Sequence, residues 1–492
     1  MFKFSGPAYP RPWAVLCALA ACGLAAGVMT AGGTASSASQ RPGSSSRATF
    51  GDAPASTRQD ADTRQDADTR QDASTRQDAS TGQDASTGQA DSPGSGPLAP
   101  SLFTEATVGQ SCFQYPPSCY APRSFLTAYG IQPLLDRGID GRGETVVVPE
   151  VASQPPADPP DVSDIRQDLA RFDSLYDIPA ARLRVVTTLA GASAPYLAGF
   201  EEVEDVEIIH AVAPQATIDV VFVPASDLNS SAGFIQAVLG FLRLAVPRSN
   251  VISISGSIGE HFVTPAEAAQ VNTALQSAES HHVTVVASTG DTGAASDPNL
   301  GSPPVKEVSL PASDPLVLAA GGTSLALDPA TGAYSGEIAW NSSAGGFSHL
   351  FARPGYQDGV ARMTATRGVP DVAADADGNT GMAVAIASSA SDYDLFPTSG
   401  TSAATPLWAG VVALADQYAH RSLGFINPAI YRIGRGQEGR TAFHDITTGD
   451  NSIVVVPRLI SGYQASRGWD PVTGWGSPNA QVLVPLLARD AS

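Results

Sequence analysis

The sequence is poor in cysteine and in basic side chains, and the shortage of basic side chains excludes some classes of partner. Its 492 residues include four cysteines, and 28 Lys and Arg residues against 48 Asp and Glu residues leave a net charge of -20. A nucleic-acid groove needs clustered Lys and Arg, so we expect no nucleic-acid partner. The acidic balance also disfavours docking on anionic membrane surfaces. Two cysteines, Cys112 and Cys119, lie in the body of the chain, and in an oxidising compartment we expect them to form one disulfide.

Long apolar runs are missing everywhere except near the N-terminus. There, Lys3 and Arg11 precede an apolar segment from Trp13 to Met29, which small residues follow. We interpret residues 1–35 as a signal peptide and expect a secreted, extracellular protein. The four residues ending at Cys22 also fit a lipoprotein box, so a lipoprotein anchored to the cell surface through Cys22 is the alternative. We expect no other membrane association.

A low-complexity segment follows the predicted signal. Residues 56–92 carry a six-residue repeat that begins as Thr-Arg-Gln-Asp-Ala at Thr57. The repeat has no apolar face at either the helical or the strand period, so it cannot bury a core. We therefore predict that residues 36–104 form a disordered spacer ahead of a folded domain over residues 105–490.

Within that domain, apolar strand patterns alternate with helical patterns. The alternation predicts an α/β fold with a mostly parallel central sheet flanked by helices on both faces, and functional residues at the carboxyl ends of the strands. A helix starting at Pro265 is well signalled, because Thr264 and Glu267 form a capping box. The expected strands are Thr145–Val148, Thr217–Val223, Val251–Ser255 and Val283–Ser288, with a further helix over Ala232–Ala245.

The motif with the strongest chemical signal runs from Ser399 to Gly410. A Gly-Thr-Ser turn leads directly into an apolar helix predicted over Ala403–Ala415. Ser402 would lie at the helix N-terminus, where the helix dipole favours developing negative charge. A lone serine in this place is more often a helix cap, but the whole string indicates a nucleophile. The turn and the helix of small residues are similar to the subtilisin-like architecture, whose base is a histidine usually followed by Gly-Thr, and none of the seven histidines here is followed by glycine.

Carboxylic acids provide candidates for the missing base. Glu201 and Asp205 are four residues apart, so a helix places them on one face, and the apolar residues that follow predict that one face is buried. Buried carboxylates repel each other unless they share protons. Asp291 follows a predicted buried strand, which puts it at the carboxyl end of the sheet. The alternatives are a solvated acidic helix face and a turn aspartate that binds its own backbone.

Together these motifs resemble the sedolisin family of serine-carboxyl peptidases over about residues 105–490. The resemblance implies a subtilisin-like fold, peptide or protein substrates, and specific roles for matching residues. By position, Ser402 is the nucleophile, Glu201 the general base, Asp205 its carboxyl partner, Asp291 the acid of the oxyanion hole, and Glu150 an outer acid. Further matching segments are Tyr129-Gly130-Ile131, Ala213-Pro214, Gly321-Gly322-Thr323-Ser324, Gly345-Gly346-Phe347-Ser348 and Pro370-Asp371-Val372.

An acidic optimum follows from these implied roles. Asp291 can stabilise an oxyanion only while protonated, because a carboxylate would repel it. Unperturbed carboxyl groups titrate near pH ~4. We therefore expect activity in acid that is lost toward neutrality.

The resemblance also implies one structural Ca²⁺ near the C-terminus. Its ligands by position are the side chains of Asp445 and Asp470 and the carbonyl oxygens of Ile446, Ser466 and Gly468. Carboxylates combined with carbonyls suit this hard cation. The alternative is two surface aspartates in a loop rich in glycine and proline.

Three departures from the family pattern keep other functions open. The family usually has a large folded propeptide, whereas the segment before residue 105 is too polar to fold as one, so we expect no self-activation by propeptide cleavage. Gly256 stands where the family usually has Trp, which should leave the network to Glu150 incomplete, and Pro149 lies where a strand prefers an N–H donor. A catalytically impaired homologue that binds peptides is the alternative function, with a histidine-dependent subtilase third. We expect a monomer.

Overall fold

The computed structural model describes residues 119–152, 163–187, 197–224, 230–295, 304–328, 331–387, 393–455 and 458–491. The predicted signal peptide and spacer lie outside these residues, and so does Cys112, so those predictions stay open. Cys119 is disulfide-bonded.

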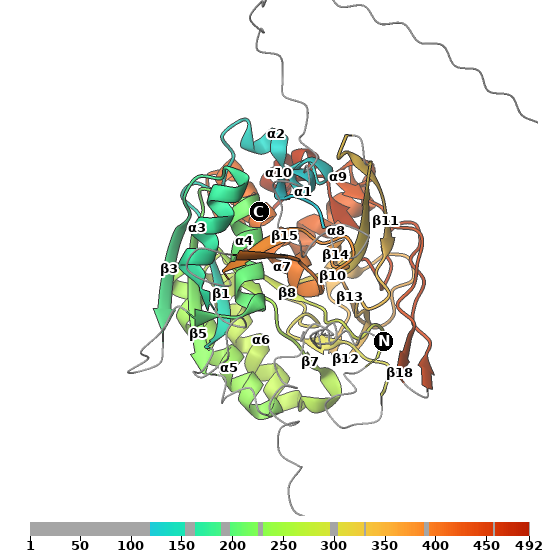
Figure 1. The fold of residues 1–492 in the computed structure, drawn as a ribbon. Coiled ribbons are helices and arrows are strands. Elements are labelled where there is room, and N and C mark those ends of the chain that lie inside the picture. The colour runs from blue at the N-terminus through green and yellow to red at the C-terminus, as the bar shows by residue number, and fades with distance from the viewer. Residues whose placement is uncertain are drawn as a thin grey trace, which may run out of the picture. The chain divides into compact units, whose positions relative to one another are not determined.

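The described residues fold around an eight-stranded sheet, drawn in Figure 1. Its strand order is β11-β10-β8-β6-β1-β5-β3, with β14 paired to β10, and every pairing is parallel except β10 with β11. The sheet therefore confirms the predicted parallel α/β architecture. The strands are β1 Thr145–Ala152, β3 Arg182–Thr187, β5 Thr217–Pro224, β6 Val251–Ile254, β8 Thr284–Ser288, β10 Leu318–Leu327, β11 Tyr334–Ala339 and β14 Val372–Asp375.

Helices cover both faces of the sheet, and a separate apolar core fills each side. Val146 and Val148 of β1 belong to one core, with residues of α3, α4, α7, α8 and α10, whereas Val147 belongs to the other, with α5 and α6. Successive strand residues point to opposite faces, which explains this split. The helices are α1 Pro122–Ala128, α2 Gln132–Leu135, α3 Ile165–Tyr176, α4 Phe200–Val212, α5 Ser231–Ala245, α6 Pro265–Ser280, α7 Thr401–Ala419, α8 Asn427–Arg435, α9 Gly439–Ala442 and α10 Ala480–Asp490.

Short antiparallel strand pairs lie outside the central sheet. They are β2 Ser163–Asp164 with β4 Leu197–Ala198, β7 Ile258–Gly259 with β9 Ser309–Leu310, β12 Gly346–Ala352 with β13 Thr366–Val369, β15 Ala383–Ala387 with β16 Tyr393–Pro397, β17 Phe443–His444 with β20 Ser477–Pro478, and β18 Ile453–Val455 with β19 Arg458–Ile460.

The sequence-based boundaries hold closely for most elements, and β1 is the main correction. The capping box of α6 is present, with Thr264 and Glu267 exchanging hydrogen bonds. The strand β1 continues through Pro149 to Ala152, so Glu150 lies within the strand rather than after it. Pairing of β1 with β6 stops at Val147, while pairing with β5 continues to Ala152. Because β1 has no ladder with β6 beyond Val147, proline is tolerated there.

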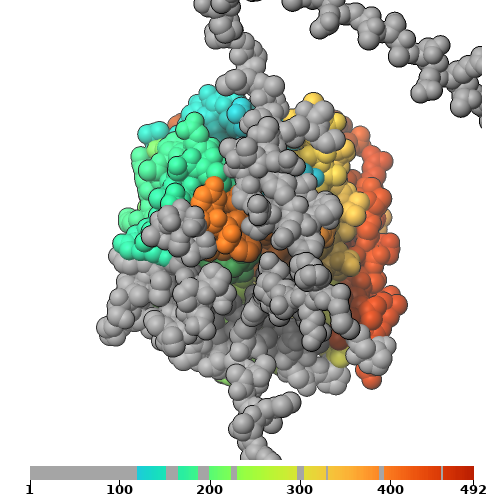
Figure 2. All heavy atoms as spheres, viewed as in Figure 1, coloured from blue at the N-terminus to red at the C-terminus, as the bar shows by residue number. Residues whose placement is uncertain are grey.

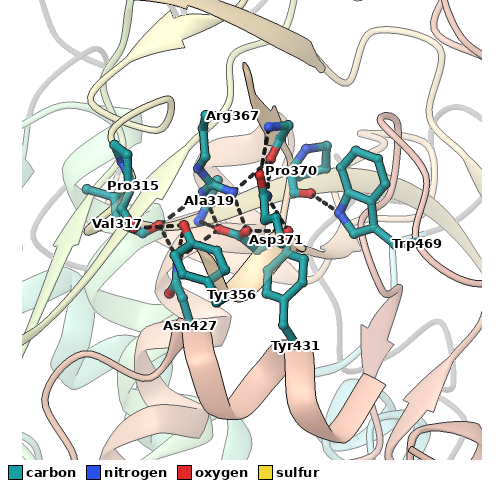
Figure 3. Close-up of polar contacts among 12 residues, drawn as sticks. Pro315, Val317, Ala319, Tyr356, Arg367, Pro370, Asp371, Asn427, Tyr431 and Trp469 are labelled. Atoms are coloured by element: carbon teal, nitrogen blue, oxygen red, sulfur yellow. Dashed lines mark hydrogen bonds and ion pairs between the residues drawn. The ribbon is translucent and has the colours of Figure 1, made fainter. Parts of the chain in front are cut away.

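A fully buried ion pair holds the chain at the start of β14 (Figure 3). Two guanidinium nitrogens of Arg367, Nη1 and Nη2, each lie 2.6 Å from a carboxylate oxygen of Asp371, and both side chains are completely buried. The backbone N–H of Ala319 and the hydroxyl of Tyr431 also donate to Asp371, at 2.8 and 2.7 Å. This network gives the Asp371 of the Pro370-Asp371-Val372 segment a structural role. A buried charge pair is tolerated when hydrogen bonds satisfy its remaining acceptors.

Candidate active site

The helix α4, which carries Glu201 and Asp205, is buried on nearly all sides. Every residue from Glu202 to Val212 is buried, so the prediction of one buried face was too modest. The hairpin β15–β16 accounts for part of this burial: Ala385 donates its N–H to Glu207 at 2.7 Å, and the rings of Phe200 and Phe396 meet edge to face. Figure 2 shows part of this hairpin, in orange, at the surface of the molecule.

A close approach of α4 to α7 brings the acids to the serine. A Cβ at Gly410 of α7 would lie 2.5 Å from Cγ1 of Val212, so only glycine allows the two helices to pack at this distance. α7 begins at Thr401, so Ser402 is its second residue. The close packing at Gly410 therefore holds α7, which carries Ser402, against α4, which carries Glu201.

Ser402 is almost completely buried and contacts an acid. Its side chain is 1% exposed and forms a hydrogen bond with the carboxyl group of Glu201. Its Oγ also lies 3.4 Å from the carbonyl oxygen of Ser255. Pro406 has no N–H to donate to the Ser402 carbonyl, and the hydroxyl of Ser255 approaches that carbonyl instead, at 3.4 Å.

Asp205 and Glu150 are two further buried acids of the site. The Asp205 carboxyl is completely buried, accepts a 2.8 Å hydrogen bond from Ser255 Oγ, and is hydrogen-bonded to Glu150. Two ionised carboxylates are both acceptors, so this last bond requires a shared proton. The predicted gap at Gly256 does not interrupt the network, because Glu150 reaches Asp205 without a side chain there.

Burial sets the protonation of these acids. Desolvation raises the pKa of Asp205 to about 8, although the Ser255 hydrogen bond opposes the shift. Desolvation and then the neighbouring charge of Asp205 raise the pKa of Glu201 well above its ordinary value, and the Ser402 hydrogen bond lowers it in part. The same two causes raise the pKa of Glu150. The acids therefore hold protons at pH values where exposed carboxyl groups have lost them.

Asp291 contacts the serine loop, which is the segment of residues 399–401 before Ser402. It follows β8, and its Oδ1 accepts the backbone N–H and the hydroxyl of Thr401, at 2.7 and 2.9 Å. Gly290, with φ of 104°, donates its N–H to the same hydroxyl at 3.0 Å. The structure thus brings Glu201, Asp205 and Asp291 around the start of α7.

The chain is similar to known peptidases in sequence and in fold. The sequence model described as "Subtilase family" matches residues 186–429. The chain is 32% identical over 393 residues to kumamolisin from Bacillus sp. (strain MN-32), covering 76% of this chain and 65% of the relative. Its structure matches Pseudomonas sedolisin, a serine-carboxyl proteinase, with a TM-score of 0.63 and 26% identity, covering 76% of this chain and 99% of that one. The chain belongs to the sedolisin family.

A second relative shows how far the match extends. Human tripeptidyl-peptidase 1 is 30% identical over 341 residues, covering 65% of this chain and 57% of the relative. The chain therefore spans less than two thirds of the length of either curated relative.

In this sedolisin-type site the base candidate is an acid, as the sequence predicts. His210 lies on α4 with the acids, but its Nε2 is 2.8 Å from Oδ1 of Asp173 on α3. His261 pairs with Glu307 at 2.6 Å. It is Glu201 whose side chain hydrogen bonds with Ser402.

Two further residues of the site were not assigned from sequence. Ser255 donates to Asp205, and Glu204, completely buried, accepts the N–H of Ser399 at 2.7 Å. Glu204 had one sequence signal, since it lies three residues after Glu201 and so shares its helix face. Ser255 ends a predicted strand, but nothing local marks its partner.

The candidate calcium residues come from two loops that meet, because Asp445 contacts the loop of residues 466–470. Asp445 accepts the N–H of Gly468 at 3.0 and 3.1 Å, and Asp470 accepts that of Ser466 at 2.8 Å. Desolvation raises the pKa of Asp445, and it raises that of Asp470 to about 6. Two neighbouring carboxylates are suitable ligands for a cation, although both oxygens of Asp470 already accept backbone N–H groups. In the described part of the chain, groups of three or more His, Cys, Asp or Glu side chains suited to a metal are absent, so this site would depend on carbonyl ligands.

Proposed function

We propose that this sedolisin-family chain is a serine peptidase that hydrolyses peptide bonds of peptide or protein substrates in acid. The observation that carries the proposal is the hydrogen bond between the buried side chain of Ser402 and the carboxyl group of Glu201. A serine hydroxyl is a weak nucleophile at its own pKa and needs an adjacent base. Glu201 is in place to be that base.

In the proposed reaction, Ser402 Oγ attacks the carbonyl carbon of the scissile bond while Glu201 takes its proton. Glu201 then returns the proton to the leaving amine as the C–N bond breaks, which leaves an acyl-enzyme. A water molecule repeats the sequence: Glu201 accepts its proton, and Ser402 regains one as the acid product leaves.

Asp205 and Glu150 support Glu201 by sharing protons with it as one titrating unit. The hydrogen bond from Ser255 orients Asp205 within this unit. The unit keeps the charge beside Ser402 low, so that a single negative charge on Glu201 can be tolerated in a buried place.

Asp291 is the proposed oxyanion donor. In its protonated form it can donate a hydrogen bond to the developing oxyanion, and it cannot do so once ionised. Activity should therefore fall toward neutral pH as Asp291 ionises. It should also fall in strong acid, where Glu201 is protonated and cannot act as the base.

We further propose one structural Ca²⁺, held by the side chains of Asp445 and Asp470 and the carbonyls of Ile446, Ser466 and Gly468. The cation would neutralise two carboxylates and fix their loop. Trp469 in this loop donates its indole N–H to the Pro370 carbonyl at 3.0 Å, which ties the loop to the start of β14 (Figure 3).

Secretion through the predicted signal, in monomeric form, completes the proposal. Among the residues that the structure describes, we find no helix with the length and apolar character needed to cross a membrane. Signal residues 1–35 and Cys22 lie outside those residues. The signal peptide is tested by N-terminal sequencing of protein recovered from culture medium.

The test of the peptidase is casein digestion at pH about 4 and about 7, with Ser402→Ala as the control. We expect digestion by the wild type in acid and none by the variant. Equal digestion by both proteins would remove Ser402 as nucleophile. Folded wild type that binds casein fragments without cutting them would instead favour the peptide-binding homologue.

A further inference from the structure

Glu204, another acid of α4, contacts the segment before the proposed catalytic serine and has no role in the mechanism above. Glu204 shares a helix face with Glu201, because it follows that residue by three positions. It is completely buried, and its Oε1 accepts the backbone N–H of Ser399 at 2.7 Å. Ser399 lies only three residues before Ser402.

The chain segment before Ser402 is held at three successive backbone N–H groups, each by a different part of the fold. The middle residue, Gly400, has φ of 81°, a conformation that favours glycine. The segment is therefore an irregular turn whose position depends on its acceptors. These bonds are Ser399 to Glu204 Oε1 at 2.7 Å, Gly400 to the Ala376 carbonyl at 2.8 Å, and Thr401 to Asp291 Oδ1 at 2.7 Å.

We propose that Glu204 is a positioning residue for the nucleophile, which holds Ser399 and so fixes where Ser402 Oγ lies relative to Glu201. The inference rests on the proposed peptidase function. Glu201 and Glu204 belong to the same helix, so one rigid element carries both the base and the acceptor that holds the serine loop. Misplacing a reacting group by about 1 Å can cost ~10²-fold in rate.

Glu204 is suited to act as a neutral acceptor. Desolvation first, and then the charges of Glu201 and Asp205, raise the pKa of Glu204 well above its ordinary value. Its Oε2 is buried and has no hydrogen-bond partner among the described residues, which would be costly for a carboxylate oxygen. A neutral amide should therefore replace the acid, whereas a hydrocarbon should not.

The same helix offers a matched control. Glu207 is 1% exposed, and its Oε2 accepts the N–H of Ala385 in β15 at 2.7 Å. It therefore makes the same kind of buried bond as Glu204, but to a segment that does not carry the serine. Replacing either acid by leucine leaves one buried N–H without an acceptor.

The experiment compares kcat, KM and melting temperature for Glu204→Leu, Glu204→Gln and Glu207→Leu in the full chain. We expect Glu204→Leu to lower kcat roughly 10- to 100-fold with little change in KM, because the serine is misplaced. Glu204→Gln should keep kcat within about fivefold and leave the acid limb of the pH profile in place. Glu207→Leu should lower the melting temperature as Glu204→Leu does, yet keep kcat.

Wild-type kcat in Glu204→Leu would overturn the inference, and so would a Glu204→Gln variant as slow as Glu204→Leu, since the acid itself would then be needed. If Glu204→Leu fails to fold, Glu204→Asp replaces it, because its carboxyl group is one methylene short of Ser399 and kcat should again fall. The proposed function fails separately, when cleavage by the wild type does not depend on Ser402.

Discussion

Thr401 donates two hydrogen bonds to a single oxygen of Asp291, from its backbone N–H at 2.7 Å and from its hydroxyl at 2.9 Å. The residue next to Ser402 is thus fastened to the acid proposed to bind the oxyanion. The loop after β8 and the start of α7 are thus held together, which fixes Asp291 relative to the start of the helix that carries Ser402.

This contact makes Asp291→Asn an informative variant. Asparagine keeps a carbonyl oxygen for Thr401 and adds an N–H donor that does not ionise, so activity should extend to higher pH than in the wild type. Asp291→Ala, which has neither, should lower kcat roughly 10²- to 10³-fold. The measurement is kcat/KM against pH. The same loss toward neutrality in Asp291→Asn and the wild type would show that Asp291 does not control it.

Asp205 should make the folded chain less stable as pH rises. Its pKa is about 8 when folded against an ordinary value of 3.8, so the native state keeps a proton that the unfolded chain releases. The stability from this group is complete below the unfolded pKa and is lost as pH rises through the folded pKa. In a Ser402→Ala background, which prevents self-digestion, Asp205→Asn should gain stability relative to its parent between pH about 4 and about 8.

Urea unfolding midpoints at several pH values measure this difference. Glu279→Gln changes an exposed carboxyl group and serves as the control, whose difference from the parent should stay flat. A pH-independent difference for Asp205→Asn would mean that Asp205 has no raised pKa in the folded chain.

Removing calcium should lower the melting temperature. EDTA would leave the charges of Asp445 and Asp470 without a cation, and added Ca²⁺ should restore the transition. Asp445→Asn should melt lower and lose the response to EDTA. Asp450→Asn, which changes a neighbouring carboxylate outside the proposed ligand set, should keep it. An unchanged transition in EDTA would leave the two aspartates as loop-stabilising residues only.

Much of the fold could be predicted because its signals are local. The capping box at Thr264 and the apolar strands place α6 and the sheet within a few residues. The length of β1 could not be predicted, because a proline such as Pro149 usually ends a strand. Here the strand continues, because β6 does not pair with β1 at Pro149. The full burial of α4 also escaped prediction, since part of it comes from the distant hairpin β15–β16.

The candidate site was likewise predicted only in part: its residues were, and the contacts between them were not. Ser402, Glu201, Asp205 and Asp291 stand in recognisable strings, and their proposed roles stay predictions until variants are measured. The contacts that join those strings depend on tertiary packing: Ser255 meets Asp205 across 50 positions of sequence, and Ser399 meets Glu204 across 195. No periodicity or spacing predicts such pairs.

The dependence of kcat/KM on Glu201 tests the account most directly. Wild type, Glu201→Gln and His210→Gln should be compared across acid pH with one peptide substrate. We predict that Glu201→Gln loses roughly 10²- to 10⁴-fold, the contribution of a general base, while folded His210→Gln keeps its activity. Near-wild-type cleavage by Glu201→Gln would contradict the activation of Ser402 by a carboxylic acid.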